Sequence, residues 1–206
     1  MEVKTIAIIG AETTGRRIAC AAAEAGYRTI LEDVSPERLE QTVAWIKQAL
    51  DKGVLRGDIE ASIRDGALPL ISTARSVEEA IRDADLIIEA VPDEMELKLE
   101  LFTIFDKFAR PGAILASCSA SLSIGEMTDV TVSQDRCIGM RFRDPVSSGK
   151  LIELVKTPLT SHETLAICSE VARRMRKEVL VVDESPIPIA TQEIRPAEKP
   201  VPECKT

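Results

Sequence analysis

The chain has few aromatic residues and a single histidine. Among its 206 residues only 3% are Phe, Trp or Tyr, and His162 is the one histidine. No cluster of Lys and Arg is interleaved with aromatic residues, and the formal net charge is −8. This balance argues against a nucleic-acid partner and against an anionic membrane surface. No apolar run approaches the roughly 20 residues that a membrane-spanning helix needs, so we expect no membrane partner.

The five cysteines form no paired motif. They stand at positions 20, 118, 137, 168 and 204, and their number is odd. The pattern therefore predicts neither a disulfide framework nor a metal site. No secretory leader precedes Lys4 and the first strand-like run, so we expect the protein to be cytoplasmic, in a reducing compartment.

The composition is that of one domain with a substantial core. The apolar content is 45%, and the sequence contains no internal repeat. Over residues 1–185, apolar strand-like runs alternate with helical patterns, which is typical of a parallel sheet covered by helices on both faces. Residues 186–206 contain five prolines among polar residues. We expect a disordered tail or linker there and not a second domain.

The periodicity and the turn residues predict individual elements. Strands are expected near residues 6–9, 29–33, 70–72, 85–91, 113–117, 137–140, 151–155 and 179–182, and helices near 16–25, 36–52, 58–65, 77–82, 94–108 and 160–176. Ser35 is expected to cap the helix that Pro36 begins, and Thr160 with Glu163 fits a capping box. His162 then falls in the first turn of the last helix, where an exposed side chain is the expectation.

The turn after the first strand nearly matches the dinucleotide-binding fingerprint. Gly10 and Gly15 hold the first and third glycine positions, which make the tight turn and pack the helix on the strand. The second position, where bare backbone approaches the pyrophosphate, is Glu12. A carboxylate about 4 Å from a pyrophosphate charge costs on the order of 4 kcal/mol, or roughly a thousandfold in affinity. This is an upper limit because Glu12 can turn toward Arg16, and we expect dinucleotide binding to be weakened or lost.

Asp33 closes the second predicted strand about 20 residues after the glycines, where a ribose-binding carboxylate belongs. The alternative is a carboxylate that only ends the strand or caps the next helix. The spacing of the whole βαβ unit favours the ribose position over that alternative.

Three later segments, residues 85–98, 114–124 and 151–158, resemble the NAD-binding domain of the 3-hydroxyacyl-CoA dehydrogenases. The resemblance covers residue 4 to about residue 185 and implies a Rossmann-type, doubly wound α/β fold. In that family a helical domain follows, which completes the acyl-CoA pocket and usually forms the dimer contact. Here Pro186-Ile-Pro188 replaces the segment that leads into it, so we expect a single domain without the helical one.

The resemblance also implies roles for particular residues, and several catalytic positions depart from the family pattern. In the family a histidine, oriented by a glutamate, handles the hydroxyl proton while hydride passes between substrate C3 and the nicotinamide. The histidine position is Arg141, the following asparagine is Asp144, and the glutamate survives as Glu153. The serine that contacts the substrate oxygen falls on Ala120, and the preceding asparagine falls on Cys118. We expect Arg141 and Glu153 to form an ion pair.

The cofactor positions agree better with the family. Besides Gly10 and Gly15, Asp33 matches the carboxylate of the adenine-side ribose. Glu89 and Lys98 match residues near the nicotinamide. NAD is therefore the cofactor that the resemblance implies, with its binding weakened by Glu12.

Three functions follow as hypotheses. The favoured one is a dehydrogenase-like, NAD-binding protein of fatty-acyl metabolism that is catalytically impaired, because a guanidinium cannot accept a proton. The second is an active NAD-dependent oxidoreductase on 3-hydroxyacyl-CoA, whose helical domain comes from another chain. We expect the face left bare without that domain to be covered by a partner chain or by a second copy. The third is an interaction module with a Rossmann core that binds no NAD.

Overall fold

The backbone forms one sheet of eight strands, as seen in the computed structural model, which describes residues 1–143 and 151–184. The strand order is β3-β2-β1-β4-β5-β6-β7-β8. The strands are β1 (Thr5–Ile9), β2 (Arg28–Glu32), β3 (Ile71–Thr73), β4 (Leu86–Glu89), β5 (Ile114–Ser117), β6 (Cys137–Phe142), β7 (Leu151–Lys156) and β8 (Glu178–Asp183). Neighbouring strands are parallel except for the antiparallel pair β6–β7. The expected doubly wound, mostly parallel sheet is confirmed.

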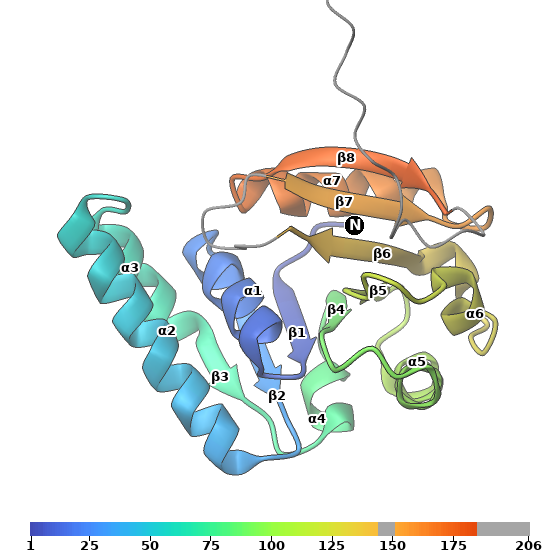
Figure 1. Ribbon diagram of the computed structural model, residues 1–206, viewed down its shortest axis with the longest axis horizontal. Coiled ribbons are helices and arrows are strands. Elements are labelled where there is room, and N and C mark those ends of the chain that lie inside the picture. The colour runs from blue at the N-terminus through green and yellow to red at the C-terminus, as the bar shows by residue number, and fades with distance from the viewer. Residues whose placement is uncertain (144–150, 185–206) are drawn as a thin grey trace, which may run out of the picture.

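Helices cover both faces of this sheet (Figure 1). They are α1 (Thr13–Glu24), α2 (Pro36–Arg56), α3 (Ala61–Ala67), α4 (Val77–Ile81), α5 (Met95–Phe108), α6 (Ile124–Thr128) and α7 (His162–Arg174), with 3-10 turns at Leu68–Leu70 and Gln134–Arg136. The sequence patterns predicted every strand and all of these helices except α6. The expectations for residues 186–206 and for Asp144 lie outside the described residues.

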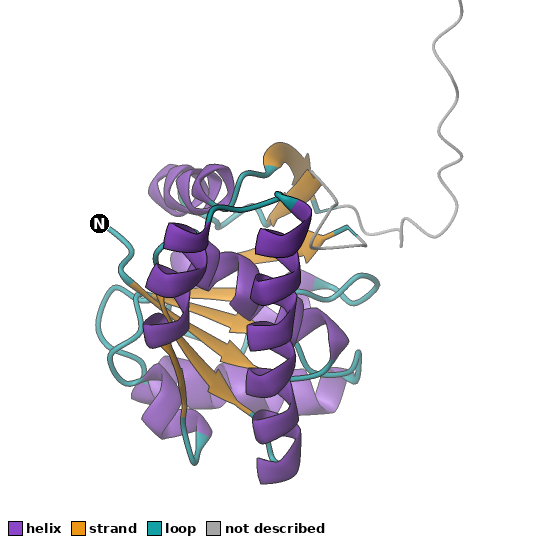
Figure 2. Cartoon of the chain, turned by 90° about the vertical axis from the view of Figure 1, so that its left-hand side faces the viewer, coloured by secondary structure: helices purple, strands orange, loops and turns teal. Residues whose placement is uncertain are grey.

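The sheet separates two apolar cores. On one face β1 contributes Ile6 and Ile8, which pack with residues of α1, α2 and α7. On the other face β1 contributes Ala7 and Ile9, which pack with residues of α4, α5 and α6. All five residues of β1 are buried, as a central strand of a parallel sheet requires. Figure 2 shows the strands fanning out behind the helices of the first face, with the twist that such sheets have.

Helix ends follow the local chemistry, with one correction. The Ser35 hydroxyl accepts a hydrogen bond from the Arg38 N–H at 3.2 Å, so Ser35 caps α2 as predicted. The prediction that Thr160 caps α7 was wrong, because Ser161 holds that position and accepts from the Thr164 N–H at 3.1 Å. Thr160 instead donates to the carbonyl of Cys137 at 2.8 Å and so ties the loop to the start of β6.

The turn between β1 and α1 has no room for side chains at its two glycines. Gly10 has φ +100°, in the region that favours glycine, and a Cβ there would lie 2.8 Å from the carbonyl oxygen of Ala90. A Cβ on Gly15 would lie 1.8 Å from the carbonyl oxygen of Gly10. Both contacts are with backbone, which cannot move aside as a flexible side chain can. The turn therefore requires glycine at both positions.

We predict that Gly15→Ala lowers the free energy of unfolding by about 2–3 kcal/mol, because the added methyl forces α1 away from β1. Gly66→Ala is the matched control, since nothing lies within 4 Å of the Cβ it adds in α3. That change is expected to raise stability by up to about 1 kcal/mol through helix propensity. Urea unfolding of both variants measures the difference, and equal effects at the two positions would contradict the steric argument.

Candidate functional site

The parallel strands end at one edge of the sheet, and the predicted site residues gather there. Asp33 follows β2, Gly10 follows β1, and Glu89 is the last residue of β4. Successive connections leave β1 in opposite directions, so β1 and β4 flank the topological switch point of the sheet. In open α/β sheets this is where ligands bind.

The turn at the switch point tolerates Glu12 without backbone strain. Glu12 is the N-cap residue of α1, with φ −72° and ψ −164°, and its side chain makes no capping hydrogen bond. The first turn of α1 contains no acidic residue. The N–H groups at this helix end therefore remain free of a side-chain cap, in the arrangement that binds phosphate in dinucleotide sites.

Asp33 ties this turn to the start of α2. Its Oδ2 accepts a hydrogen bond from the Ala11 N–H at 2.9 Å, and its Oδ1 accepts from the Ser35 N–H at 3.0 Å. Arg38 Nη1 lies 3.2 Å from Oδ1 and 3.3 Å from Oδ2. The side chain of Asp33 is only 3% exposed. The carboxylate thus joins the glycine turn to the cap residue Ser35 without capping α2 itself, and it lies at the position where a ribose-binding carboxylate belongs.

Glu12 pairs with Arg38 and not with Arg16, the residue toward which the sequence allowed it to turn. Arg38 Nη1 lies 3.2 Å from Glu12 Oε1. The guanidinium of Arg16 stacks instead on the ring of Trp45, 4.5 Å from its centroid. Arg16 lies on the side of α1 that packs against α2, where an aromatic face is available. Arg38 projects from the first turn of α2 beside the glycine turn.

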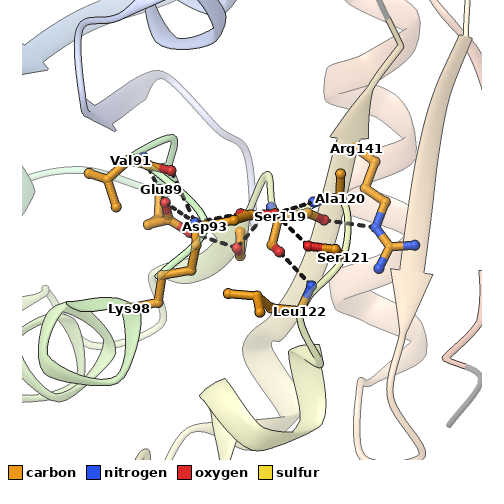
Figure 3. Close-up of polar contacts among 10 residues, drawn as sticks. Glu89, Val91, Asp93, Lys98, Ser119, Ala120, Ser121, Leu122 and Arg141 are labelled. Carbon is orange, nitrogen blue, oxygen red and sulfur yellow. Dashed lines mark hydrogen bonds and ion pairs between the residues drawn. The ribbon is translucent and has the colours of Figure 1, made fainter. Parts of the chain in front are cut away.

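Glu89 and Lys98 form a buried ion pair, so the structure brings these two predicted residues together (Figure 3). Lys98 Nζ lies 2.6 Å from Glu89 Oε1, with the two side chains 1% and 0% exposed. The hydroxyl of Ser117 donates to Glu89 Oε2 at 2.6 Å, and the Val91 N–H donates to Oε1 at 2.7 Å. Lys98 Nζ also donates to the carbonyl of Val91 at 3.2 Å. Both charges are therefore paired and hydrogen-bonded.

Asp93 extends this network toward the loop after β5, and sequence reasoning gave it no role. It lies 3.3 Å from Lys98 Nζ and accepts from the Ser121 hydroxyl at 3.0 Å and from the Ala120 N–H at 3.3 Å. Burial raises the pKa of Asp93, but the hydrogen bond from Ser121 and the charge of Lys98 outweigh it and hold the pKa below its usual value. The sequence could have pointed to Asp93 because it stands between Glu89 and Lys98, in the segment 85–98 that resembles the family.

The expected ion pair between Arg141 and Glu153 is absent, although the two residues are opposite each other in the β6–β7 pairing. Glu153 Oε1 is bound by Arg143, with Nε at 2.9 Å and Nη2 also in contact. Arg141 Nε donates to the carbonyl of Ser119 at 2.8 Å (Figure 3). The loop after β5 thus holds Arg141, and Arg143, which follows the end of β6, pairs with the carboxylate of Glu153.

In this half of the site Ala120 and Arg141 cannot accept a proton, whereas the carboxylate of Glu153 can. Ala120 offers a methyl group and a backbone N–H, and that N–H is directed to Asp93. Glu153 Oε2 is buried and makes no hydrogen bond within the part of the chain that the structure describes. The position opposite Glu153 carries a guanidinium, which is a donor only.

A cavity of 940 Å³ opens at the β2 end of the edge, between α2 and the loop that follows β3. Its wall includes Glu32, Asp33, Lys47 and Glu78, and it does not reach Arg141 or Glu153. Glu32 is 6% exposed, and burial, followed by the charges of Asp33 and Glu78, raises its pKa to about 7. Sequence reasoning missed this carboxyl, whose only signal was a second acid beside Asp33.

The cysteine thiols are not suited to act as nucleophiles, because burial disfavours the thiolate. Burial raises the pKa of the Cys137 thiol to about 11 and that of Cys168 to about 12, and it also raises the pKa values of Cys20 and Cys118. In residues 1–143 and 151–184, no group of three or more His, Cys, Asp or Glu side chains could hold a metal ion. Within the same ranges, none of the helices has the length and apolar character to cross a membrane.

Comparison with known proteins identifies the family. Residues 5–185 match the family described as 3-hydroxyacyl-CoA dehydrogenase, NAD binding domain. The chain belongs to this family. NAD is accordingly the cofactor of the family, and the glycine turn with its uncapped helix end fits the pyrophosphate of such a group.

Individual relatives agree with this assignment. The chain is 36% identical over 186 residues to a probable 3-hydroxybutyryl-CoA dehydrogenase of Bacillus subtilis, covering 90% of this chain and 64% of the relative. It is 32% identical over 190 residues to the mitochondrial hydroxyacyl-coenzyme A dehydrogenase of Sus scrofa, covering 89% and 60%. The solved 3-hydroxybutyryl-CoA dehydrogenase of Escherichia coli superposes with a TM-score of 0.86 at 28% identity, covering 90% and 39%. The chain thus spans less than two thirds of the length of each of these three relatives.

We predict that Lys98→Met lowers the free energy of unfolding by about 3–5 kcal/mol, because Glu89 is left as a buried, unpaired charge. The double variant Lys98→Met with Glu89→Gln should recover much of this loss. Lys107→Met, an exposed position on the same helix, serves as control and should change stability by about 1 kcal/mol or less. Urea unfolding measures all three, and a small effect of Lys98→Met would contradict the buried pair.

We predict that Glu32 makes stability depend on pH. The folded protein holds the Glu32 proton up to about pH 7, whereas the unfolded chain releases it near the ordinary pKa of 4.5. Stability should therefore fall as pH rises from about 4.5 to 7, by roughly 3 kcal/mol, and the Glu32 contribution should be constant outside this window. Glu32→Gln should remove this slope in urea unfolding curves. A variant that keeps the wild-type slope would show that another group titrates.

Proposed function

We propose that this chain binds NAD(H) at the carboxyl edge of its sheet and is impaired as a 3-hydroxyacyl-CoA dehydrogenase. The observation that carries the proposal is the contrast between the two ends of the edge. The glycine turn, Asp33 and the buried pair of Glu89 and Lys98 are present at the cofactor end. At the other end Arg141 occupies the histidine position and is bound to the carbonyl of Ser119.

The residues of the edge suit different parts of the cofactor. The N–H groups at the start of α1 are placed for the pyrophosphate, and Asp33 for the adenine-side ribose. By their resemblance to the family, Glu89 at the end of β4 and Lys98 in α5 would lie on the nicotinamide side. When bound, NAD supplies a hydride acceptor. The chain itself then has to place the substrate and receive the hydroxyl proton.

In our proposal, the impaired step is the transfer of the substrate's hydroxyl proton. The guanidinium of Arg141 stays protonated and cannot act as a base. Loss of a positioned acid or base costs about 10²–10⁴ in rate. Ala120 lacks the hydroxyl that would contact the substrate oxygen, and a missing donor of this kind costs roughly 10²–10³, although the two losses need not multiply.

A second candidate function is an active oxidoreductase whose helical part comes from another chain. Two observations favour it. The buried Oε2 of Glu153 has no hydrogen-bond donor in the described ranges, so this carboxylate has a free acceptor site for a hydroxyl proton. The edge strand β8 also exposes Leu180 and Val181, at 44% and 42%, as a surface that a partner chain or second copy would cover. Acyl-CoA is the substrate class in this case, and the cytoplasmic location stays a prediction in both.

The proposal predicts saturable quenching or enhancement of NADH fluorescence on titration with the purified protein, together with no detectable oxidation of 3-hydroxybutyryl-CoA. Absence of binding up to about millimolar NADH, the weak end of the usual affinity scale, would leave the interaction module as the function. Turnover that Glu153→Ala abolishes would establish the oxidoreductase instead. As a positive control, Arg141→His with Ala120→Ser should raise any residual turnover by about 10²-fold or more, while NADH affinity stays unchanged.

A further inference from the structure

We infer that Arg38 is the counter-ion that allows Glu12 to stand in the nucleotide-binding turn, and that it makes nucleotide affinity depend on this pair. The inference rests on the proposed NAD(H) binding and adds a residue to it. In the fingerprint, the position of Glu12 is a glycine because a pyrophosphate approaches the backbone there. A lone carboxylate at that position would repel the ligand.

The geometry places one cation between two carboxylates. Nη1 of Arg38 lies 3.2 Å from Glu12 Oε1 and 3.2 Å from Asp33 Oδ1. Asp33 is almost completely buried, whereas Glu12 and Arg38 are 50% and 41% exposed. The buried carboxylate therefore fixes the guanidinium in place, and the fixed guanidinium draws the mobile carboxylate of Glu12 toward α2. The start of α1 is left without an unpaired negative charge.

The sequence position of Arg38 explains why its guanidinium is held beside Glu12 and Asp33. Ser35 caps α2 by accepting from the Arg38 N–H, and Asp33 accepts from the Ser35 N–H. Arg38 thus lies in the first turn of α2, where its backbone is fixed by the same loop that carries Asp33. A basic residue in a first helical turn is unfavourable with respect to the helix dipole. The two carboxylates at 3.2 Å offset that cost.

Arg38 also has an effect that weakens nucleotide binding. Each oxygen of Asp33 already accepts one backbone N–H, and Arg38 occupies the remaining acceptor positions of both. A ribose hydroxyl that binds Asp33 must therefore displace part of this contact. With Glu12 present, charge neutralisation is the larger effect because it acts on the doubly charged pyrophosphate. With a glycine at position 12, only the competition for Asp33 remains.

A double-mutant cycle on nucleotide affinity tests the inference. The dissociation constants of NADH and of ADP-ribose are measured by calorimetry for the wild type, Arg38→Met, Glu12→Gly and the double variant. Arg38→Met should weaken binding by about tenfold or more when Glu12 is present, a coupling of about 1.4 kcal/mol. In the Glu12→Gly background the same change should alter affinity by less than about twofold or strengthen it.

Controls separate charge, folding and the proposed function. Arg56→Met removes the same charge at the far end of α2, where Arg56 pairs with Asp58, and should leave affinity within about twofold. Should Arg38→Met fail to fold because Asp33 loses its cation, Arg38→Gln retains amide donors for Asp33 and must show the same coupling. An equal effect of the Arg38 change in both backgrounds, or no effect in either, overturns the inference. If Glu12→Gly binds NADH and the wild type does not, Arg38 fails to compensate and the inference is wrong, whereas failure of both proteins to bind refutes the proposed function itself.

Discussion

The close approach of α1 to β1 at Gly10 and Gly15 is the constraint on which the functional edge depends. A side chain on Gly15 would overlap the carbonyl of Gly10, so the helix lies as near the strand as backbone allows. This contact directs the start of α1 to the edge where the parallel strands end. It also brings the Ala11 N–H to Asp33, and so it links the turn to α2. The same edge receives Glu89 from β4 and Ser117 from β5 because both strands run parallel to β1.

Four of the carboxylates at this edge are paired with a cation. Arg38 serves Glu12 and Asp33, Lys98 serves Glu89, and Arg143 serves Glu153. Removing charges from water is costly, so such pairs contribute little net stability, yet loss of one partner leaves a charge that the interior cannot solvate. In residues 1–143 and 151–184 no cation pairs with Glu32, and burial with the charges of Asp33 and Glu78 raises its pKa to about 7. A ligand that enters this edge therefore exchanges contacts with paired groups and does not meet bare charges.

Membership of the family settles the fold and the cofactor class, but activity depends on particular side chains. The cofactor end has an intact framework of turn, buried pair and carboxylate. The proton-transfer end combines a guanidinium, a methyl group and a carboxylate, one oxygen of which has no partner among the described residues. A domain with an intact cofactor end is suited to bind a dinucleotide. Whether it also oxidises a substrate depends on a hydroxyl group that reaches the carboxylate of Glu153.

The sequence by itself determined the strands, the helices other than α6 and their order, because apolar periodicity, glycines and caps act over a few residues. Spacing after the glycines indicated Asp33, and the resemblance to the family indicated Glu89 and Lys98. Only the tertiary structure decided which partner each charged side chain takes. Glu12 forms an ion pair with Arg38 and not with Arg16, and Glu153 forms one with Arg143 and not with Arg141. Long side chains reach several neighbours from one backbone position, so their pairing depends on groups from other elements, such as the Ser119 carbonyl and the Trp45 ring, that local sequence does not specify.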